Sequence, residues 1–332
     1  MSCLTAEVVW NLNQTDLCSF LDLGCFKPQS PVIYFYAPSF SCYNNRYFCN
    51  STQLFSSISV TGRTCALNCK HCNGKLLQTM HSAISPQELY DLGLKLKLDD
   101  VRGVLVSGGC LADGSVPLDK FGAVLGQLKH ELGLSVFVHT GIIGKQSSVL
   151  LKQAGIDVAL IDVLGSQKTI QTVFNTNISL QDYLTSLKSL RDAQLGVIPH
   201  VIVGLNEGKL EGEYNALKMI KETLNPAALV IIAFMPLPGT DMAQTPPPHP
   251  IDIAKIVAVT RTMFPYTPLA LGCMRPKGKH RAQTDVLALK AGVDAIAFPS
   301  LEVIEYAKNN GYKTTFSSYC CAQLYQDFKL DR

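Results

Sequence analysis

Short apolar runs alternate with amphipathic stretches along most of the chain. The first run alternates β-branched and small residues, and the seven that follow are apolar on both faces, which is typical of strands buried between two layers. We therefore expect a set of parallel strands. Their predicted ranges are 57–61, 101–106, 135–138, 158–162, 197–203, 229–234, 269–272 and 295–298.

The stretches between these runs have helical periodicity. Residues 86–97 place Leu89, Leu92 and Leu96 on one face, and residues 179–194 repeat the pattern. Alternation of strands and helices implies a parallel sheet. The predicted fold class is α/β, a (β/α)8 TIM-type barrel that is full or nearly closed. With 332 residues and 47% hydrophobic content, the chain can supply such a barrel and extensions.

Three parts of the chain are predicted. Residues 1–56 form a cysteine-containing N-terminal extension, residues 57–310 form the barrel, and residues 311–332 form a C-terminal tail. The extension contains a strand-like run at 32–36 but no barrel repeat, and we expect it to pack over the barrel.

The net charge and the lengths of the apolar runs limit the kinds of partner that we expect. The net charge of +3 is too small for the electrostatic footprint of a nucleic-acid-binding protein. No apolar run approaches the roughly 18 residues that span a bilayer, and the first residues lack the features of a signal peptide. We expect a cytoplasmic protein with no nucleic-acid or membrane partner. Its 12 cysteines should ligate metal or lie buried rather than form disulfides.

The strongest chemical signal is a Cys-x3-Cys-x2-Cys segment formed by Cys65, Cys69 and Cys72. Cysteine thiolates hold iron–sulfur clusters, and a compact loop can ligate three irons while leaving the fourth without a protein ligand. The segment follows the first predicted strand, where barrel enzymes place their chemistry. A structural zinc site is the alternative, but such sites normally pair two cysteine knuckles, and the sequence has no second knuckle of matching spacing.

The spacing and position of this segment resemble the radical S-adenosylmethionine superfamily. The resemblance implies a 4Fe–4S cluster on the three cysteines, with S-adenosylmethionine bound at the open iron and cleaved by one electron to a 5′-deoxyadenosyl radical. It also implies that His71, the residue before the third cysteine, lies beside the adenine.

Two further strand ends are similar to cofactor-binding segments of that superfamily. Ser107, Gly108 and Gly109 resemble the Gly-Gly-Glu segment that meets the methionine amino group, although Cys110 replaces the acid. Asp162 stands where a ribose-binding polar residue often stands. A tight turn at the glycines and a capping or solvated aspartate are the alternatives.

The next two strand ends continue the resemblance. Gly204 and Glu207 belong to a segment similar to one near the adenine and ribose, and Pro238 and Gly239 resemble an adenine-bordering turn of biotin and lipoyl synthases. A turn of this composition also occurs at strand ends without such a role.

The loop after the seventh predicted strand is basic. We expect Arg275, Lys277 and Arg281 to bind substrate, either a carboxylate or an acidic carrier protein, and a solvated basic loop is the alternative. His139 directly follows the third predicted strand and His200 lies within the fifth, and we expect both to line the core or a pocket rather than bind metal.

The tail resembles the C-terminal Arg-Ser-Ser-Tyr of lipoyl synthases, in which a serine ligates an auxiliary cluster. The arginine is missing here, and the upstream cysteines are not at that family's spacing. We predict a second, auxiliary 4Fe–4S cluster nevertheless, with free buried cysteines as the alternative. Its expected ligands are Cys42, Cys49, Cys320 and Cys321, with Ser317 or Ser318 as an auxiliary ligand and Cys18 and Cys25 as substitutes.

Together these features look most like one subunit of the two-protein lipoyl synthase found mainly in archaea. This resemblance implies sulfur insertion into an unactivated C–H bond of an octanoyl chain on a lipoyl-carrier protein, with sulfur drawn from the auxiliary cluster. It implies a sibling radical S-adenosylmethionine subunit and an electron donor such as ferredoxin as partners. Two other hypotheses stay open: another biotin-synthase-like radical enzyme (mutase, lyase or maturase) acting on a small molecule, and a non-catalytic metal-binding scaffold.

Overall fold

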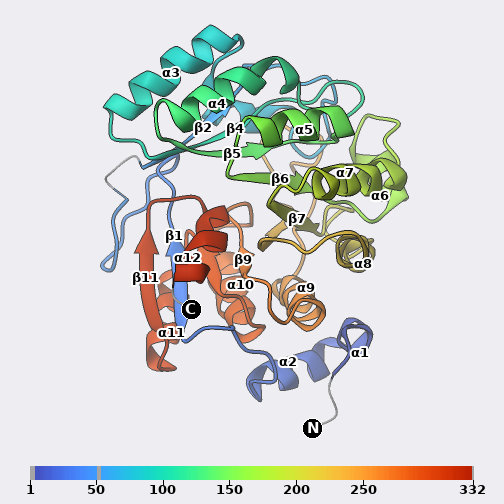
Figure 1. Cartoon of the computed structure of the whole chain (residues 1–332). Helices are drawn as coiled ribbons and strands as arrows, with labels where there is room; N and C mark the ends of the chain where they lie inside the picture. The colour runs from blue at the N-terminus through green and yellow to red at the C-terminus, as the bar shows by residue number, and fades with distance from the viewer. Residues whose placement is uncertain (1–3, 51–53, 331–332) are drawn as a thin grey trace.

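The chain folds around one parallel sheet. The structure, a computed structural model, describes residues 4–50 and 54–330. In this part of the chain the sheet has 11 strands in the order β11-β1-β10-β9-β8-β7-β6-β5-β4-β2-β3. Figure 1 shows the sheet curling, with most helices along its outer side. The expected α/β class with a parallel sheet is therefore confirmed.

All eight strands expected from the apolar runs are present. They are β2 (Phe55–Ser59), β4 (Gly103–Ser107), β5 (Ser135–His139), β6 (Val158–Asp162), β7 (Val197–Val203), β8 (Leu229–Ala233), β9 (Leu269–Leu271) and β10 (Ala295–Ala297). Three further strands are β1 (Val32–Tyr36), β3 (His81–Ser82) and β11 (Lys313–Ser317).

The helices begin where the sequence carries capping residues. Helix α3 (Pro86–Leu98) follows Ser85, whose side chain accepts a hydrogen bond from the Glu88 amide. Helix α7 (Leu180–Asp192) has a capping box in which Ser179 and Asp182 bond each other's backbone amides. Both helices match their predicted ranges to within a few residues.

The remaining helical segments complete the outer layer and the two ends of the chain. No helix in the described residues is long and apolar enough to cross a membrane. The segments are α1 (Ala6–Asn11), α2 (Gln14–Asp22), η1 (Lys75–Thr79), η2 (Asp119–Phe121), α4 (Gly122–His130), α5 (Lys145–Gln153), α6 (Gln167–Val173), α8 (Glu213–Thr223), α9 (Pro250–Met263), α10 (Lys279–Lys290), α11 (Leu301–Asn309), η3 (Cys321–Gln323) and α12 (Leu324–Leu330).

The expected closed, eight-stranded barrel is corrected by the sheet order. Strands β3 and β11 are the two edges, and no pairing joins them in the described residues. Strand β1 pairs in parallel with both β10 and β11, with Tyr34 opposite Ala295 and Thr315. The run at 32–36 is therefore a strand of the sheet and does not pack over it. Its backbone N–H and C=O groups hydrogen bond to those of β10, which would otherwise be unpaired. The division at residues 56 and 310 stays a prediction.

The C-terminal segment fills part of the space inside the curl. The ring of Tyr325 on α12 lies 6.0 Å from that of Phe137 on β5, measured between centroids. The ring of Tyr319 lies 5.7 Å from that of Phe55 on β2. The tail thus contacts strands far from its own edge of the sheet (Figure 1). Apolar side chains of the tail thus occupy part of the interior, and the candidate polar residues lie towards the carboxyl ends of the strands.

Candidate functional site

The three-cysteine segment lies in the loop after β2, and we call residues 65–72 the cluster loop. Three backbone hydrogen bonds hold it against other parts of the chain: the Ala66 amide donates to the Cys110 carbonyl at 2.8 Å, the Lys70 amide donates to the Val173 carbonyl at 2.9 Å, and the Lys70 carbonyl accepts from the Met242 amide at 3.3 Å. The loop is therefore fixed by the segments that follow β4, β6 and β8.

The thiols of the cluster loop face one another and Cys110. Cys69 is buried, whereas Cys65 and Cys72 are half-buried. A hydrogen bond from the Cys110 thiol lowers the pKa of Cys65 to about 5, although burial opposes this shift. A hydrogen bond between Cys69 and Cys72 lowers the pKa of Cys72 and raises the pKa of Cys69. The thiolate is the form that binds iron, and these hydrogen bonds favour it at Cys65 and Cys72.

The surroundings of the loop fit a bound cluster and ligand. His71 Nδ1 and Asn73 Oδ1 are buried and have no hydrogen-bond partner in the described part of the chain. The His71 ring lies 5.3 Å from that of Phe174. Buried polar atoms are normally satisfied, so unpartnered ones beside three convergent thiols indicate that a ligand completes the site. The donor set fits a 4Fe–4S cluster on Cys65, Cys69 and Cys72.

The glycine segment after β4 packs directly on the cluster loop. An added Cβ on Gly109 would collide with the Thr64 carbonyl and lie 2.7 Å from Cys65 Cα. The Gly109 amide donates to Thr61 Oγ1 at 2.7 Å, and Ser107 Oγ donates to the His139 carbonyl at 3.1 Å. Position 109 therefore requires glycine because the cluster loop packs directly against it. The sequence does not reveal this contact. A contact of Gly108 and Gly109 with methionine stays a prediction.

The turn after β8 also contacts this region. Lys75, just beyond the cluster loop, donates from Nζ to the Pro238 carbonyl at 2.6 Å. Gly239 has a φ of +71°, and an added Cβ would lie 2.6 Å from Lys75 Nζ. The structure therefore brings the Pro238-Gly239 turn against Lys75, close to the cluster loop, and its cofactor role stays a prediction.

The segment after β7 contains an acid that sequence reasoning missed. Glu213 is buried, and it accepts hydrogen bonds from the Gly204 amide at 2.8 Å and the Glu211 amide at 2.7 Å. Burial raises the pKa of Glu213. Glu207, the acid chosen from the sequence, is exposed. No sequence signal separates these two acids, because burial depends on the packing of the loop onto α8.

His139 and Asp162 end strands β5 and β6, and they meet His200, which lies in the middle of β7. His139 Nε2 lies 3.5 Å from Asp162 Oδ1, and the two histidine rings lie 5.7 Å apart. Burial lowers the pKa of His200 to about 4, so this ring is neutral at pH 7. Burial acts to raise the pKa of Asp162, but the neighbouring His139 outweighs it and the pKa is lowered. Asp162 also lies close enough to the cluster loop for its charge to interact with His71.

The two tail cysteines lie within electrostatic reach of a third cysteine, Cys273, which the sequence did not indicate as a ligand. Cys320 and Cys321 hydrogen bond to each other, and the negative charge of Cys320 adds to burial in raising the pKa of Cys273 to about 11. We call Cys273, Cys320 and Cys321 the tail cysteine group. The other predicted ligands differ in exposure: Ser318 is buried, Ser317 is half-buried, and Cys18, Cys25, Cys42 and Cys49 are exposed.

The basic loop after β9 divides into buried and accessible cations. Arg275 is fully buried, and its guanidinium donates to Asp285 Oδ1 at 2.8 Å and to the Gly272 carbonyl at 2.6 Å. Arg281 is half-buried and donates to the Arg275 carbonyl at 3.0 Å. Lys277 is exposed. The donors of Arg275 are thus used within the fold, which leaves Lys277 and Arg281 as the cations available to a ligand.

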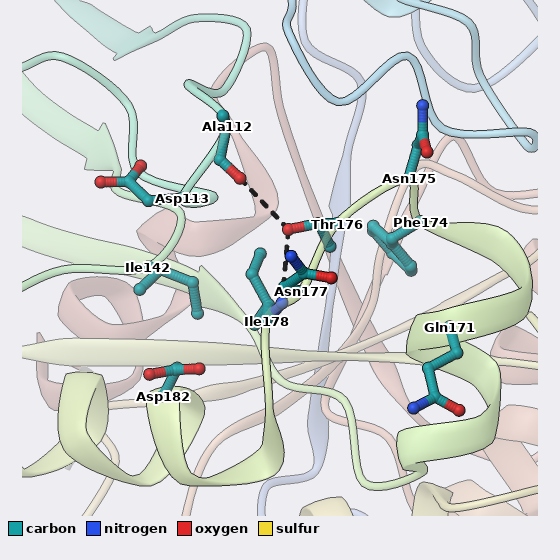
Figure 2. A pocket seen from close by; sticks show the side chains of 10 residues that line it. All are labelled: Ala112, Asp113, Ile142, Gln171, Phe174, Asn175, Thr176, Asn177, Ile178 and Asp182. Atoms are coloured by element: carbon teal, nitrogen blue, oxygen red, sulfur yellow. Dashed lines mark hydrogen bonds between the residues drawn. The ribbon is translucent and has the colours of Figure 1, made fainter.

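A cavity of about 770 Å³ lies beside the cluster loop. Figure 2 shows its lining, which is mostly polar and includes Asp113, Asn175 and Asp182. Thr176 Oγ1 donates to the Ala112 carbonyl at 3.2 Å and closes one wall (Figure 2). The cavity adjoins the cluster loop because Phe174, which also lines it, contacts His71.

Comparison with known proteins supports the family suggested by the motif. No family model matches the chain. A biotin synthase from Acidithiobacillus ferrooxidans is 25% identical over 255 residues, covering 74% of this chain and 78% of the relative. A biotin synthase from Coxiella burnetii is 22% identical over 272 residues, covering 80% and 81%.

Solved structures share the fold. The [FeFe]-hydrogenase maturase HydG aligns with a TM-score of 0.65 and 16% identity, over 98% of this chain and 75% of HydG. Methylornithine synthase, PylB, aligns with a TM-score of 0.62 and 14% identity, over 98% and 95%. The chain is thus similar in sequence to biotin synthases, and it shares its fold with these two solved structures.

Proposed function

We propose that this chain inserts sulfur into an unactivated C–H bond of an octanoyl chain borne on a lipoyl-carrier protein. The observation that supports the proposal is the presence of two groups of cysteines: the cluster loop, and the tail cysteine group, whose members lie within electrostatic reach of one another. The first fits the cluster that binds S-adenosylmethionine. The second fits an auxiliary 4Fe–4S cluster that supplies the sulfur.

The cluster loop would hold the first cofactor through Cys65, Cys69 and Cys72. When bound, the cluster and S-adenosylmethionine supply a 5′-deoxyadenosyl radical that abstracts hydrogen from the substrate. The chain's own residues position the ligand. The unpartnered His71 Nδ1 would hydrogen bond to the adenine. The Cys110 carbonyl holds the loop in place by accepting a hydrogen bond from the Ala66 amide.

The auxiliary cluster would take ligands from the tail cysteine group. Cys42 and Cys49 are candidates to complete the set, because the segment that carries them also places Tyr43 and Phe48 against the hydrophobic cluster that contacts Cys273 and Cys320. Ser317 and Ser318 stand just before the tail cysteines in sequence. A cubane needs four ligands, so at least one of these residues would add to the three cysteines.

The partners follow from the same proposal. An octanoylated carrier protein is the substrate, and the accessible cations Lys277 and Arg281 suit an acidic carrier surface. A sibling radical S-adenosylmethionine subunit would insert the other sulfur, an electron donor such as ferredoxin would reduce the first cluster, and the reaction would take place in the cytoplasm.

Anaerobic reconstitution with an octanoylated carrier peptide tests the proposal directly. Mass spectrometry should detect a peptide with one added sulfur, and chromatography should detect 5′-deoxyadenosine in the same reaction. The unmodified peptide is the matched control and should give no thiolated product. Formation of 5′-deoxyadenosine without any thiolation, in the presence of the sibling subunit as well, would contradict sulfur insertion.

A second candidate function is radical chemistry on a small molecule, as a mutase, lyase or maturase. The polar cavity of about 770 Å³ beside Phe174 favours it, since this volume suits a small polar substrate. Iron content separates the two functions: sulfur insertion requires about eight irons per chain, whereas a single-cluster enzyme requires about four.

A further inference from the structure

His139, Asp162 and His200 lie on neighbouring strands inside the curl. Each residue lies two positions beyond an inward-facing apolar residue of its own strand. Because side chains alternate between the two faces of a strand, all three side chains point into the same interior. Strand pairing places Asp162 directly opposite His200. The apolar residues beneath them are Phe137, Leu160 and Ile198.

The distances within this trio suit a shared metal ion. One potential ligand atom from each of the three residues lies within 4.8 Å of the other two. The separation of 3.5 Å between His139 Nε2 and Asp162 Oδ1 is at the weak limit for a hydrogen bond. By contrast, two nitrogen or oxygen ligands on a tetrahedral zinc ion lie about 3.4 Å apart, given bond lengths near 2.1 Å. The His139–Asp162 pair thus has the spacing of two ligands on one ion, and a ligand atom of His200 lies within 4.8 Å of both.

The orientation of His200 provides a second, independent observation. Its Nδ1 lies 3.1 Å from the Ile198 carbonyl oxygen. With Nδ1–H donating to that oxygen, Nε2 keeps its lone pair. Metal-binding histidines are typically held in this way, with one ring nitrogen bonded to a backbone carbonyl and the other bonded to the ion.

Two of the three side chains are also partly exposed to solvent. The His139 and Asp162 side chains are 22% and 40% exposed, so a bound ion would keep open coordination positions. Two histidines and one carboxylate with open positions are the ligands of catalytic zinc and of non-haem iron. We propose that His139, Asp162 and His200 bind one divalent transition-metal ion, separate from both cysteine groups. This inference does not depend on the proposed sulfur insertion.

Cobalt binding to the full-length, cluster-reconstituted protein tests the site. High-spin Co²⁺ gives an electron paramagnetic resonance signal, whereas 4Fe–4S clusters in the 2+ state are silent, so the signal reports bound cobalt without interference from the clusters. We expect one tightly bound Co²⁺ per chain. His139→Ala and His200→Ala should weaken its binding at least a hundredfold, and Asp162→Asn should weaken it about tenfold.

Matched controls separate ligation from a loss of folding. His81 is an exposed histidine on β3, and His81→Ala should leave Co²⁺ affinity unchanged. Iron content should be the same in all variants, and Co²⁺ should raise the thermal unfolding midpoint of the natural sequence but not of His139→Ala. Equal Co²⁺ affinity in the natural sequence and both histidine variants, or no Co²⁺ binding, would overturn the proposal.

Two further measurements identify competing uses of the same residues. Excess S-adenosylmethionine should leave Co²⁺ bound; displacement would assign Asp162 to the nucleotide and overturn a separate metal site. Cys320 lies close enough for its charge to act on His139. X-ray absorption should therefore detect nitrogen and oxygen ligands, and a first shell made of sulfur would place the ion on the cysteines instead.

Discussion

The cluster loop and the tail cysteine group bring cysteines near one another in different ways. The cluster loop carries its three cysteines within eight consecutive residues, and neighbouring segments only hold it in place. The tail cysteine group joins Cys273, after β9, to Cys320 and Cys321, which follow β11. A contiguous loop keeps its ligand spacing whenever the local turn forms. A group assembled from distant segments exists only while the surrounding packing is intact.

The largest expected effect comes from the cluster loop itself. Cys69→Ala removes a buried ligand and should abolish 5′-deoxyadenosine formation, because two thiolates do not hold the cluster in a state that cleaves S-adenosylmethionine. Chromatography after anaerobic reconstitution measures this. Cys18→Ala changes an exposed cysteine away from both groups and should retain full cleavage. Cleavage that survives in Cys69→Ala would remove the cluster assignment.

The tail cysteine group should respond in the opposite way. Cys320→Ala is expected to spare 5′-deoxyadenosine formation but to stop thiolation of the octanoyl peptide, with iron falling from about eight to about four per chain. Ser19→Ala, at an exposed position on α2, is the control for both readouts. Unchanged iron and thiolation in Cys320→Ala would mean that the two groups are not two cluster sites.

The support behind the tail cysteine group gives the third test. Arg275→Met leaves Asp285 buried without its cation and should lower the free energy of unfolding by about 3–5 kcal/mol. Urea unfolding measures the change. Lys277→Met, two residues away and exposed, should change stability by less than about 0.5 kcal/mol. Equal effects from the two variants would show that the buried ion pair does not hold this loop.

The support behind the cluster loop should be less sensitive. Gly109→Ala inserts a methyl group against Thr64 and Cys65, and the overpacking should lower the free energy of unfolding by about 1–3 kcal/mol. Iron retention during dialysis should fall in parallel. At Gly122, the first residue of α4, an added Cβ has only one contact at 4.0 Å, so Gly122→Ala should be neutral or stabilising by up to about 1 kcal/mol. A tolerated Gly109→Ala would show that the glycine does not brace the loop.

Local patterns determined much of the architecture. The eight apolar runs became strands β2 and β4–β10, since a run that is apolar on both faces is stable only between two layers. Helices α3 and α7 also lie at their predicted positions, because helical periodicity and capping residues are local features of the sequence. The sequence missed the sheet's true edges, because the insertion of β1 between β10 and β11 depends on hydrogen bonds between residues more than 250 positions apart.

The features of the site also separate into those determined by local sequence and those decided by tertiary packing. Short-range spacing alone determined the three-cysteine motif and its place after a strand, because a turn of eight residues carries its own geometry. Only the tertiary structure decided that Cys273 joins Cys320 and Cys321, that Arg275 turns inward to Asp285, and that Glu213 rather than Glu207 is buried. It also brought His139, Asp162 and His200 together. The physical reason is that burial and long-range contact depend on how strands and loops pack side by side, which no stretch of neighbouring residues encodes.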